Sequence, residues 1–263
     1  MDEAVKGLHA KRSASHVSRT ADHDLVNQKA TLARRLTAEG VGTALLLAAV
    51  VGSGIMGENL AAGNVAIALL ANTVATGAAL VALITAFAPI SGAHFNPAVS
   101  LFDASQGGLT WSEAGAYIVV QFVGAVVGVM VAHVMFTEDV LMVSQRVRAG
   151  FPQAFSEGVA TFGLLCTIWG CVRRPPHIAP FAVGAYITAA CWFTASTSFA
   201  NPAVTVARAL TDTFAGIRPA DVPPFLVAQL LGAAAATILF RWLTPTIRQG
   251  SDDVVGSHDE SAP

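Results

Sequence analysis

Long apolar stretches alternate with short polar connections through most of the chain, and polar stretches flank them at both ends. A helix needs ~20 predominantly apolar residues to cross the hydrocarbon core of a bilayer. Six stretches reach or approach that length, and we expect membrane-spanning helices at about residues 34–56, 64–88, 113–136, 154–173, 178–197 and 222–244. The pattern therefore predicts an all-α membrane protein with six transmembrane helices.

The polar ends are predicted to lie outside the membrane domain. Residues 1–31 are mixed in charge and lack an apolar run, which is typical of a disordered tail rather than of a signal peptide. Residues 245–263 form a second polar tail. The membrane domain is then expected at 32–244.

Two NPA motifs interrupt the apolar pattern, one after the second stretch and one after the fifth. Asn is a preferred helix N-cap and Pro is favoured at the first helical position, so each motif predicts the start of a helix. Irregular backbone at membrane depth is tolerated only when it is buried in protein or lines a cavity. We therefore expect two re-entrant half-helices that face a water-filled path. The motifs are Asn96, Pro97, Ala98 and Asn201, Pro202, Ala203.

The two halves of the chain are related to each other. Glu39 and Glu157 lie in similar short sequences, AEGVGT and SEGVAT, and each precedes its NPA motif by a comparable distance. Three spans separate equivalent points, so the second half must cross the membrane in the opposite direction. An inverted repeat, with one half at about 32–136 and the other at about 153–244, is typical of channels and transporters.

Composition excludes several classes of function. Only 12% of the residues are charged, compared with roughly 25% in soluble domains. The net charge of -2 argues against a nucleic-acid partner. The three cysteines have neither zinc-site nor disulfide-framework spacing, and no nucleophile–base pair is recognisable. We therefore expect no enzyme activity and no metal site.

The sequence SGAHFNPAV at Ser91–Val99, the second NPA motif, the paired glutamates and the six-span repeat closely resemble the major intrinsic proteins, which include aquaporins and aquaglyceroporins. The resemblance covers about 34–244. It implies the aquaporin fold, a homotetramer in the lipid bilayer, and passive conduction of water or small neutral solutes through each protomer, with no cofactor. It also implies that Glu39 and Glu157 hold the backbones of the re-entrant loops, although a proton relay is the alternative.

One position departs from the family pattern. Most members have Arg directly after the second NPA motif, where this chain has Val204. Arg208 lies one helical turn further on, and Asp103 lies at the matching place after the first motif. Each is expected in a vestibule, either as a solvated charge or as a group that steers solutes. His94 is expected either to line the path or to cap a loop.

Spacing from the NPA motifs, together with the resemblance, predicts a selectivity filter without fixed charge, aromatic ring or histidine. Such a filter resembles that of bacterial aquaporin-like channels from arsenic-resistance operons, which implies trivalent or methylated arsenicals as solutes in addition to glycerol. Ala190 and Trp192 are alternatives for the fifth-span position. The expected filter residues are Thr76, Cys191, Ser198 and Val204.

Basic residues predict the orientation. Eleven of the fifteen Lys and Arg residues fall on the side of the two termini, which places both termini in the cytoplasm. We therefore expect a multi-pass protein of a bacterial inner membrane that conducts small uncharged solutes. The alternatives are a water-selective aquaporin, a proton-coupled transporter and a non-conducting scaffold.

Overall fold

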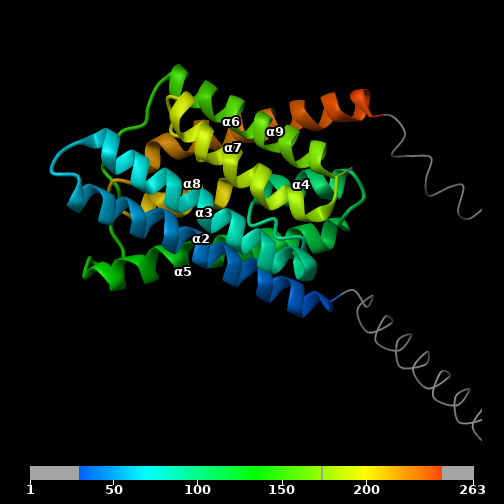
Figure 1. The fold of residues 1–263 in the computed structure, drawn as a ribbon, viewed down its shortest axis with the longest axis horizontal. Coiled ribbons are helices and arrows are strands. Elements are labelled where there is room, and N and C mark those ends of the chain that lie inside the picture. Colours follow the sequence, from blue (N-terminus) through cyan, green and yellow to red (C-terminus); the bar gives the residue numbers. More distant parts are fainter. Residues whose placement is uncertain (1–29, 173, 245–263) are drawn as a thin grey trace, which may run out of the picture.

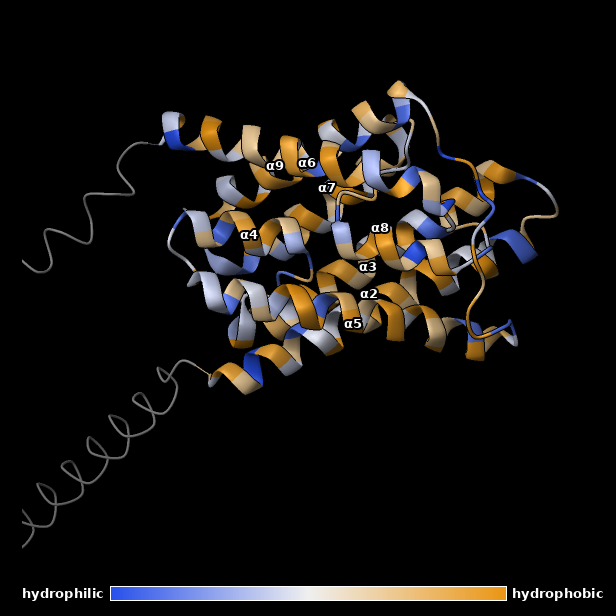
Figure 2. Cartoon of the chain, turned by 180° about the vertical axis from the view of Figure 1, so that it is seen from behind, coloured by the Kyte–Doolittle hydropathy of each residue, from blue (hydrophilic) through white to orange (hydrophobic). Residues whose placement is uncertain are grey.

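A computed structural model describes residues 30–172 and 174–244, and this part of the chain contains helices and no strands. The expected tails at 1–31 and 245–263 lie outside the described residues, except for residues 30 and 31. The long helices form one bundle, in which hydrophobic residues dominate (Figures 1 and 2). They are α2 (Leu32–Leu60), α3 (Val65–Ser91), α5 (Trp111–Phe136), α6 (Phe151–Cys171), α7 (Ala179–Phe193) and α9 (Val222–Leu243).

The fifth expected span, at 178–197, is shorter than predicted. Five of the described helices are long and apolar enough to cross a membrane, and α7 has only 15 residues. The 3₁₀ turn η1 (Pro176–Ile178) precedes it, and at ~1.5 and ~2.0 Å per residue the two together extend about 28 Å. The helix ends early because Thr194 adopts an extended conformation and begins a re-entrant loop.

Two short helices lie among the long ones (Figure 1). Helix α4 (Pro97–Ser105) follows the first NPA asparagine, and α8 (Pro202–Ala207) follows the second. Each asparagine caps its helix through its side-chain oxygen, which accepts backbone N–H groups of the first turn. The two expected half-helices are therefore confirmed, although the last three residues of the second form the 3₁₀ turn η2 (Arg208–Leu210).

Equivalent glycines bring the long helices of each half into close contact. A Cβ atom on Gly124 of α5 would lie 2.3 Å from the carbonyl oxygen of Gly40 on α2. In the second half, a Cβ atom on Gly232 of α9 would lie 2.2 Å from the carbonyl oxygen of Gly158 on α6. Only glycine permits this approach of two helix backbones. The pair α2 and α5 in the first half and the corresponding pair α6 and α9 in the second half are therefore packed through equivalent glycine contacts.

The first described helix begins, and the last one ends, at the same end of the bundle (Figures 1 and 2). Helix α4 lies toward this end. At the opposite end, the connection from α5 to α6 pairs with the segment that follows α8. Met142 and Ser144 donate backbone hydrogen bonds to Leu210 and Ala209 at 3.1 and 3.0 Å. This pairing covers the far end of the second half-helix.

Candidate functional site

A cavity of about 290 Å³ passes between the two halves and reaches both NPA asparagines. Its wall is formed by parts of α2, α3, α6 and α7, by both half-helices and by the two loops that precede them. Most of the lining side chains are apolar. The polar groups that break this surface come mainly from the re-entrant segments, which therefore determine the chemistry of the cavity.

The two asparagines are fixed by each other's loops. The Nδ2 atom of Asn96 donates to the carbonyl oxygen of Ala200 at 2.8 Å, and the Nδ2 atom of Asn201 donates to that of Phe95 at 2.7 Å. A side-chain amide carries two N–H donors. One donor of each asparagine is therefore held by backbone of the other half, and the second is available to a molecule in the cavity.

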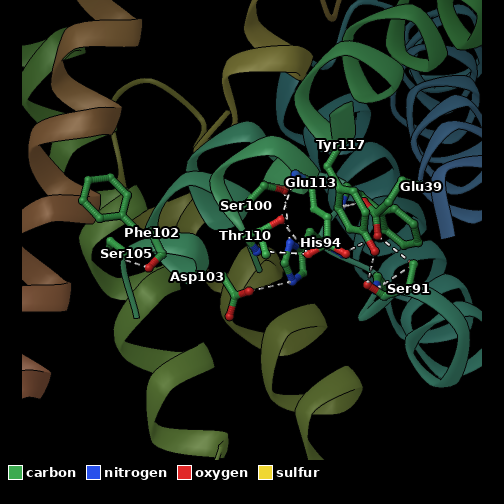
Figure 3. Close-up of polar contacts among 12 residues, drawn as sticks. Glu39, Ser91, His94, Ser100, Phe102, Asp103, Ser105, Thr110, Glu113 and Tyr117 are labelled. Atoms are coloured by element: carbon green, nitrogen blue, oxygen red, sulfur yellow. Dashed lines mark hydrogen bonds and ion pairs between the residues drawn. The ribbon is translucent and has the colours of Figure 1, made fainter. Parts of the chain in front are cut away.

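The first glutamate is fully buried behind its re-entrant loop. The backbone N–H groups of His94 and Phe95 donate to the Glu39 carboxylate at 2.9 and 2.7 Å, and the Ser91 hydroxyl donates at 2.7 Å. Figure 3 shows Ser91 and Tyr117 beside Glu39. These contacts fix the backbone directly before Asn96.

Glu157 makes equivalent contacts in the second half. It is fully buried and accepts the backbone N–H groups of Phe199 and Ala200, both at 2.8 Å. Both glutamates hold loop backbone, as expected from the resemblance, and both lie behind the loops rather than on the cavity wall. This placement favours the loop-holding role over a proton relay along the path.

Two glutamines complete these networks, and the sequence analysis missed them. Gln121 donates to Glu39 and to the Ser100 hydroxyl, both at 2.9 Å. Gln229 donates to Glu157 at 2.7 Å and to the Thr205 hydroxyl at 2.8 Å. A signal was present, because each glutamine stands three residues before the glycine that packs against the facing helix. The networks therefore tie each half-helix to its neighbouring long helices.

The expected filter residues share the cavity wall. Trp192, an alternative for the fifth-span position, is 48% exposed on the outside of the bundle, and Ala190 is fully buried. The geometry thus supports the choice of Cys191 at that position. All four expected filter residues are among the residues that line the cavity, namely Thr76, Cys191, Ser198 and Val204.

The cavity wall nevertheless contains a cation, Arg208, which is only 6% exposed. Its Cζ atom lies 3.4 Å from the centroid of the Phe199 ring. Its Nε atom donates to the carbonyl oxygen of Ala215. These contacts hold the guanidinium group against the cavity wall. The burial of Arg208 differs from the first of its two expected roles, that of a solvated charge in a vestibule.

A second arginine supports the same region. The Nε atom of Arg148 donates to the carbonyl oxygen of Gly216 at 2.8 Å, and its Nη1 atom donates to that of Ser196 at 3.1 Å. Its Cζ atom lies 4.9 Å from the Phe199 ring centroid. Burial lowers the pKa of Arg148 to about 10, so the group stays cationic at neutral pH. No sequence pattern predicted this contact, because Arg148 belongs to an irregular connection.

His94 and Asp103 line another part of the cavity. The Nδ1 atom of His94 lies 3.1 Å from the Ser100 hydroxyl, and its Nε2 atom lies 3.9 Å from the nearer Asp103 oxygen (Figure 3). The His94 side chain therefore lines the cavity and contacts the half-helix that follows its loop. Asn72, another lining residue, donates to the carbonyl oxygen of Val50 at 2.7 Å and thereby joins α3 to α2.

Comparison with known proteins gives consistent results. The chain matches the family model described as Major intrinsic protein over residues 26–199 and 176–261. It is 55% identical over 230 residues to the aquaglyceroporin AqpS of Rhizobium meliloti, a match that covers 86% of this chain and 98% of that protein. It is 32% identical over 246 residues to the probable aquaporin AqpM of Archaeoglobus fulgidus, with 81% and 98% covered.

A solved structure supports the same fold. The X-ray structure of the aquaglyceroporin from Plasmodium falciparum matches with a TM-score of 0.64 at 19% sequence identity, and the match covers 85% of this chain and 100% of that one.

Proposed function

Since the chain belongs to the major intrinsic protein family, we propose that it is a passive membrane channel for small uncharged solutes, glycerol among them. Members of this family are channels and not enzymes. The observation that carries the proposal is the cavity that passes both half-helix N-termini between the two halves of the bundle. The apolar wall and the cavity volume leave room for a solute larger than water.

The half-helices supply the main barrier to cations. Each helix N-terminus carries about half a positive charge, and two of them face the middle of the path. The free amide donors of Asn96 and Asn201 bind and orient an oxygen-bearing solute as it passes. A water molecule oriented by two such donors interrupts a chain of hydrogen bonds, which opposes proton conduction.

Val204 is the basis for the proposed solute class. An arginine at this position presents a cation and several donors, whereas Val204 presents methyl groups beside Cys191 and Thr76. A solute with an apolar part loses less free energy on dehydration where the wall can cover that part. The solutes that this filter suits are glycerol and the trivalent or methylated arsenicals, in addition to water.

Replacing Val204 tests the filter. Val204→Arg should reduce uptake of glycerol and methylated arsenicals by about tenfold or more, because the longer side chain obstructs the path and adds a second positive charge to that of Arg208. Uptake is measured in proteoliposomes at equal protein density. Val143→Arg is the matched control, because Val143 is 62% exposed in the α5–α6 connection and lies outside the cavity wall.

Three outcomes argue against parts of this proposal. If the wild type passes water alone, the protein is a water-selective aquaporin. If Val204→Arg and Val143→Arg conduct the larger solutes equally well, Val204 does not form the constriction. Complete absence of solute flux in folded wild-type protein favours the scaffold alternative.

We also propose that both termini lie in the cytoplasm of a bacterial plasma membrane and that the protein is a homotetramer. The described ends of the chain lie at one end of the bundle (Figure 1), and most basic residues fall on that side. Cleavage of terminal tags by external protease would contradict the orientation. A monomeric mass in native detergent extracts would contradict the tetramer.

A further inference from the structure

The two half-helices present the same series of residue types to the cavity, except at the last position. In each half the series starts at the capping asparagine and continues three and seven residues later, which places its members on one helix face. The third member is an acid in one half and a base in the other. The two series are Asn96, Val99, Asp103 and Asn201, Val204, Arg208, and all six residues line the cavity.

Arg208, the positively charged residue of the second series, has no acidic partner among the described residues. No carboxylate of residues 30–172 and 174–244 lies within 4.0 Å of Arg208. Its Nη atoms have no acceptor in the described protein, and they retain accessible surface although the side chain is 94% buried. Since Arg208 lines the cavity, these donors open toward it. Arg148 adds a second cation on the same phenylalanine ring. The field at this part of the path is therefore positive.

Asp103, the negatively charged residue of the first series, lies at a position where its own helix does not stabilise a negative charge. Asp103 belongs to the last turn of α4, and the C-terminal end of a helix carries about half a negative charge. Its nearest basic neighbour is the His94 ring, whose Nε2 atom lies 3.9 Å away. Arg241 also reaches this region, but it donates to the Ser105 carbonyl oxygen and to Gln106 rather than to Asp103. A carboxylate on the cavity wall is thus unfavourable for the fold and needs a functional explanation.

The positive groups of the path have opposite effects on cations and anions. Dehydration in a narrow, apolar cavity opposes ions of both signs. The two half-helix N-termini and Arg208 add a further barrier for cations, but the same groups attract anions. Among the described residues that line the cavity, Asp103 is therefore the only one whose charge repels small anions.

We infer that Asp103 is a specificity-determining residue that excludes small anions, in opposition to Arg208, so that only uncharged solutes cross. This role of Asp103 rests on the proposed function as a neutral-solute channel. It explains how the channel excludes the anions that its positively charged groups attract. The two charged residues act at different parts of one path, and each rejects ions that the other attracts.

Flux measurements on charge-neutral variants test this inference. Wild-type protein, Asp103→Asn, and the double variant Asp103→Asn with Arg208→Gln are each reconstituted into proteoliposomes. Uptake of glycerol, nitrate and potassium is then measured separately for each preparation. Asp103→Asn should raise nitrate flux, and the ratio of nitrate flux to glycerol uptake in the same preparation, by about tenfold or more, because the repulsion is removed. Potassium flux should remain at the wild-type level. Adding Arg208→Gln should lower the nitrate flux again, since the attraction is lost.

Two controls separate charge from folding. Asp139→Asn removes the same charge from the exposed α5–α6 connection and should leave nitrate flux unchanged. Asp103→Glu keeps the charge at the site and should exclude nitrate as the wild type does. If Asp103→Asn does not fold, Asp103→Ser replaces it with the same expected anion flux.

The outcomes distinguish this inference from the proposed function. Wild-type protein that fails to pass glycerol contradicts the proposed channel. Glycerol uptake with no rise of nitrate flux in folded Asp103→Asn or Asp103→Ser overturns the role of Asp103 and leaves the channel standing. Nitrate flux through the wild type, or an equal rise in Asp139→Asn, overturns it as well.

Discussion

The loops before the two asparagines are held in a backbone conformation that ordinary residues avoid. Ala93 and Phe95 have φ angles of 51° and 48°, and Ser198 and Ala200, at the same distances before the second asparagine, have 50° and 48°. Non-glycine residues in this left-handed region cost roughly 1–3 kcal/mol each. The buried glutamates offset this strain because they accept the N–H groups of these loops.

Truncating such a glutamate should therefore prevent folding rather than alter selectivity. Glu39→Ala leaves buried N–H donors of His94 and Phe95 unpaired, at about 1–3 kcal/mol for each donor. We expect a loss of most monodisperse protein in size-exclusion chromatography and a lower Tm in what remains. Glu58→Ala, at an exposed position of the same helix, should behave as the wild type. Full yield of Glu39→Ala together with ion-dependent uptake would instead indicate a coupled transporter.

Single side chains also show where sequence reasoning stops. The caps follow from local patterns, whereas the loop-holding glutamates and the four expected filter positions follow from spacing together with the family resemblance. The position of Arg208 does not, because it depends on the Phe199 ring and on the carbonyl oxygen of Ala215, which only the folded chain brings to it. A helical register predicted the correct face for Arg208 but not its burial.

The long helices pack against each other through close contact of their backbones, whereas the helices of soluble proteins pack mainly through large side chains. Gly124 on α5 shows this most clearly, since its missing Cβ atom makes room for the Gly40 carbonyl group of α2. Apolar side chains gain little from packing against one another rather than against lipid tails, so the closeness of fit matters more than apolar area.

Gly124→Ala should separate α5 from α2. Its Cβ atom would come within 2.3 Å of backbone, which flexible side chains cannot relieve. Overpacking of this kind costs about 1–3 kcal/mol, so we expect the Tm in detergent to fall by roughly 5 °C. Gly115→Ala on the same helix is the control, because no atom lies within 4 Å of its added methyl group. Equal Tm values for the two variants would show that the close contact is not needed.

Hydropathy predicted the long helices well and the ends of α7 poorly. The residues directly after Phe193 are small, uncharged Thr, Ala and Ser residues, which do not interrupt the apolar stretch clearly, although they form a re-entrant loop. Hydropathy reports burial in the membrane region and not backbone conformation, so it cannot separate a helix from a loop that the protein itself buries. For the same reason, the 3₁₀ end of the second half-helix was not visible in the sequence.

The whole molecule combines two related halves around one path. Both halves supply a capped half-helix, a glutamate–glutamine network and a glycine contact between two long helices. The cavity lies where the halves meet, and neither Glu39 nor Glu157 is among the residues that line it. This arrangement favours passive movement down a gradient over coupling to protons, which needs a titratable relay on the path.

Glycerol uptake under an imposed proton gradient tests the central claim most directly. Proteoliposomes containing the wild type are given a glycerol gradient, with and without a pH difference and a membrane potential, and internal glycerol is followed to its final level. A passive channel predicts that the initial rate depends only on the glycerol gradient and that the final concentrations inside and outside are equal in every condition. Accumulation of glycerol above the external concentration, driven by the proton gradient, would contradict the account.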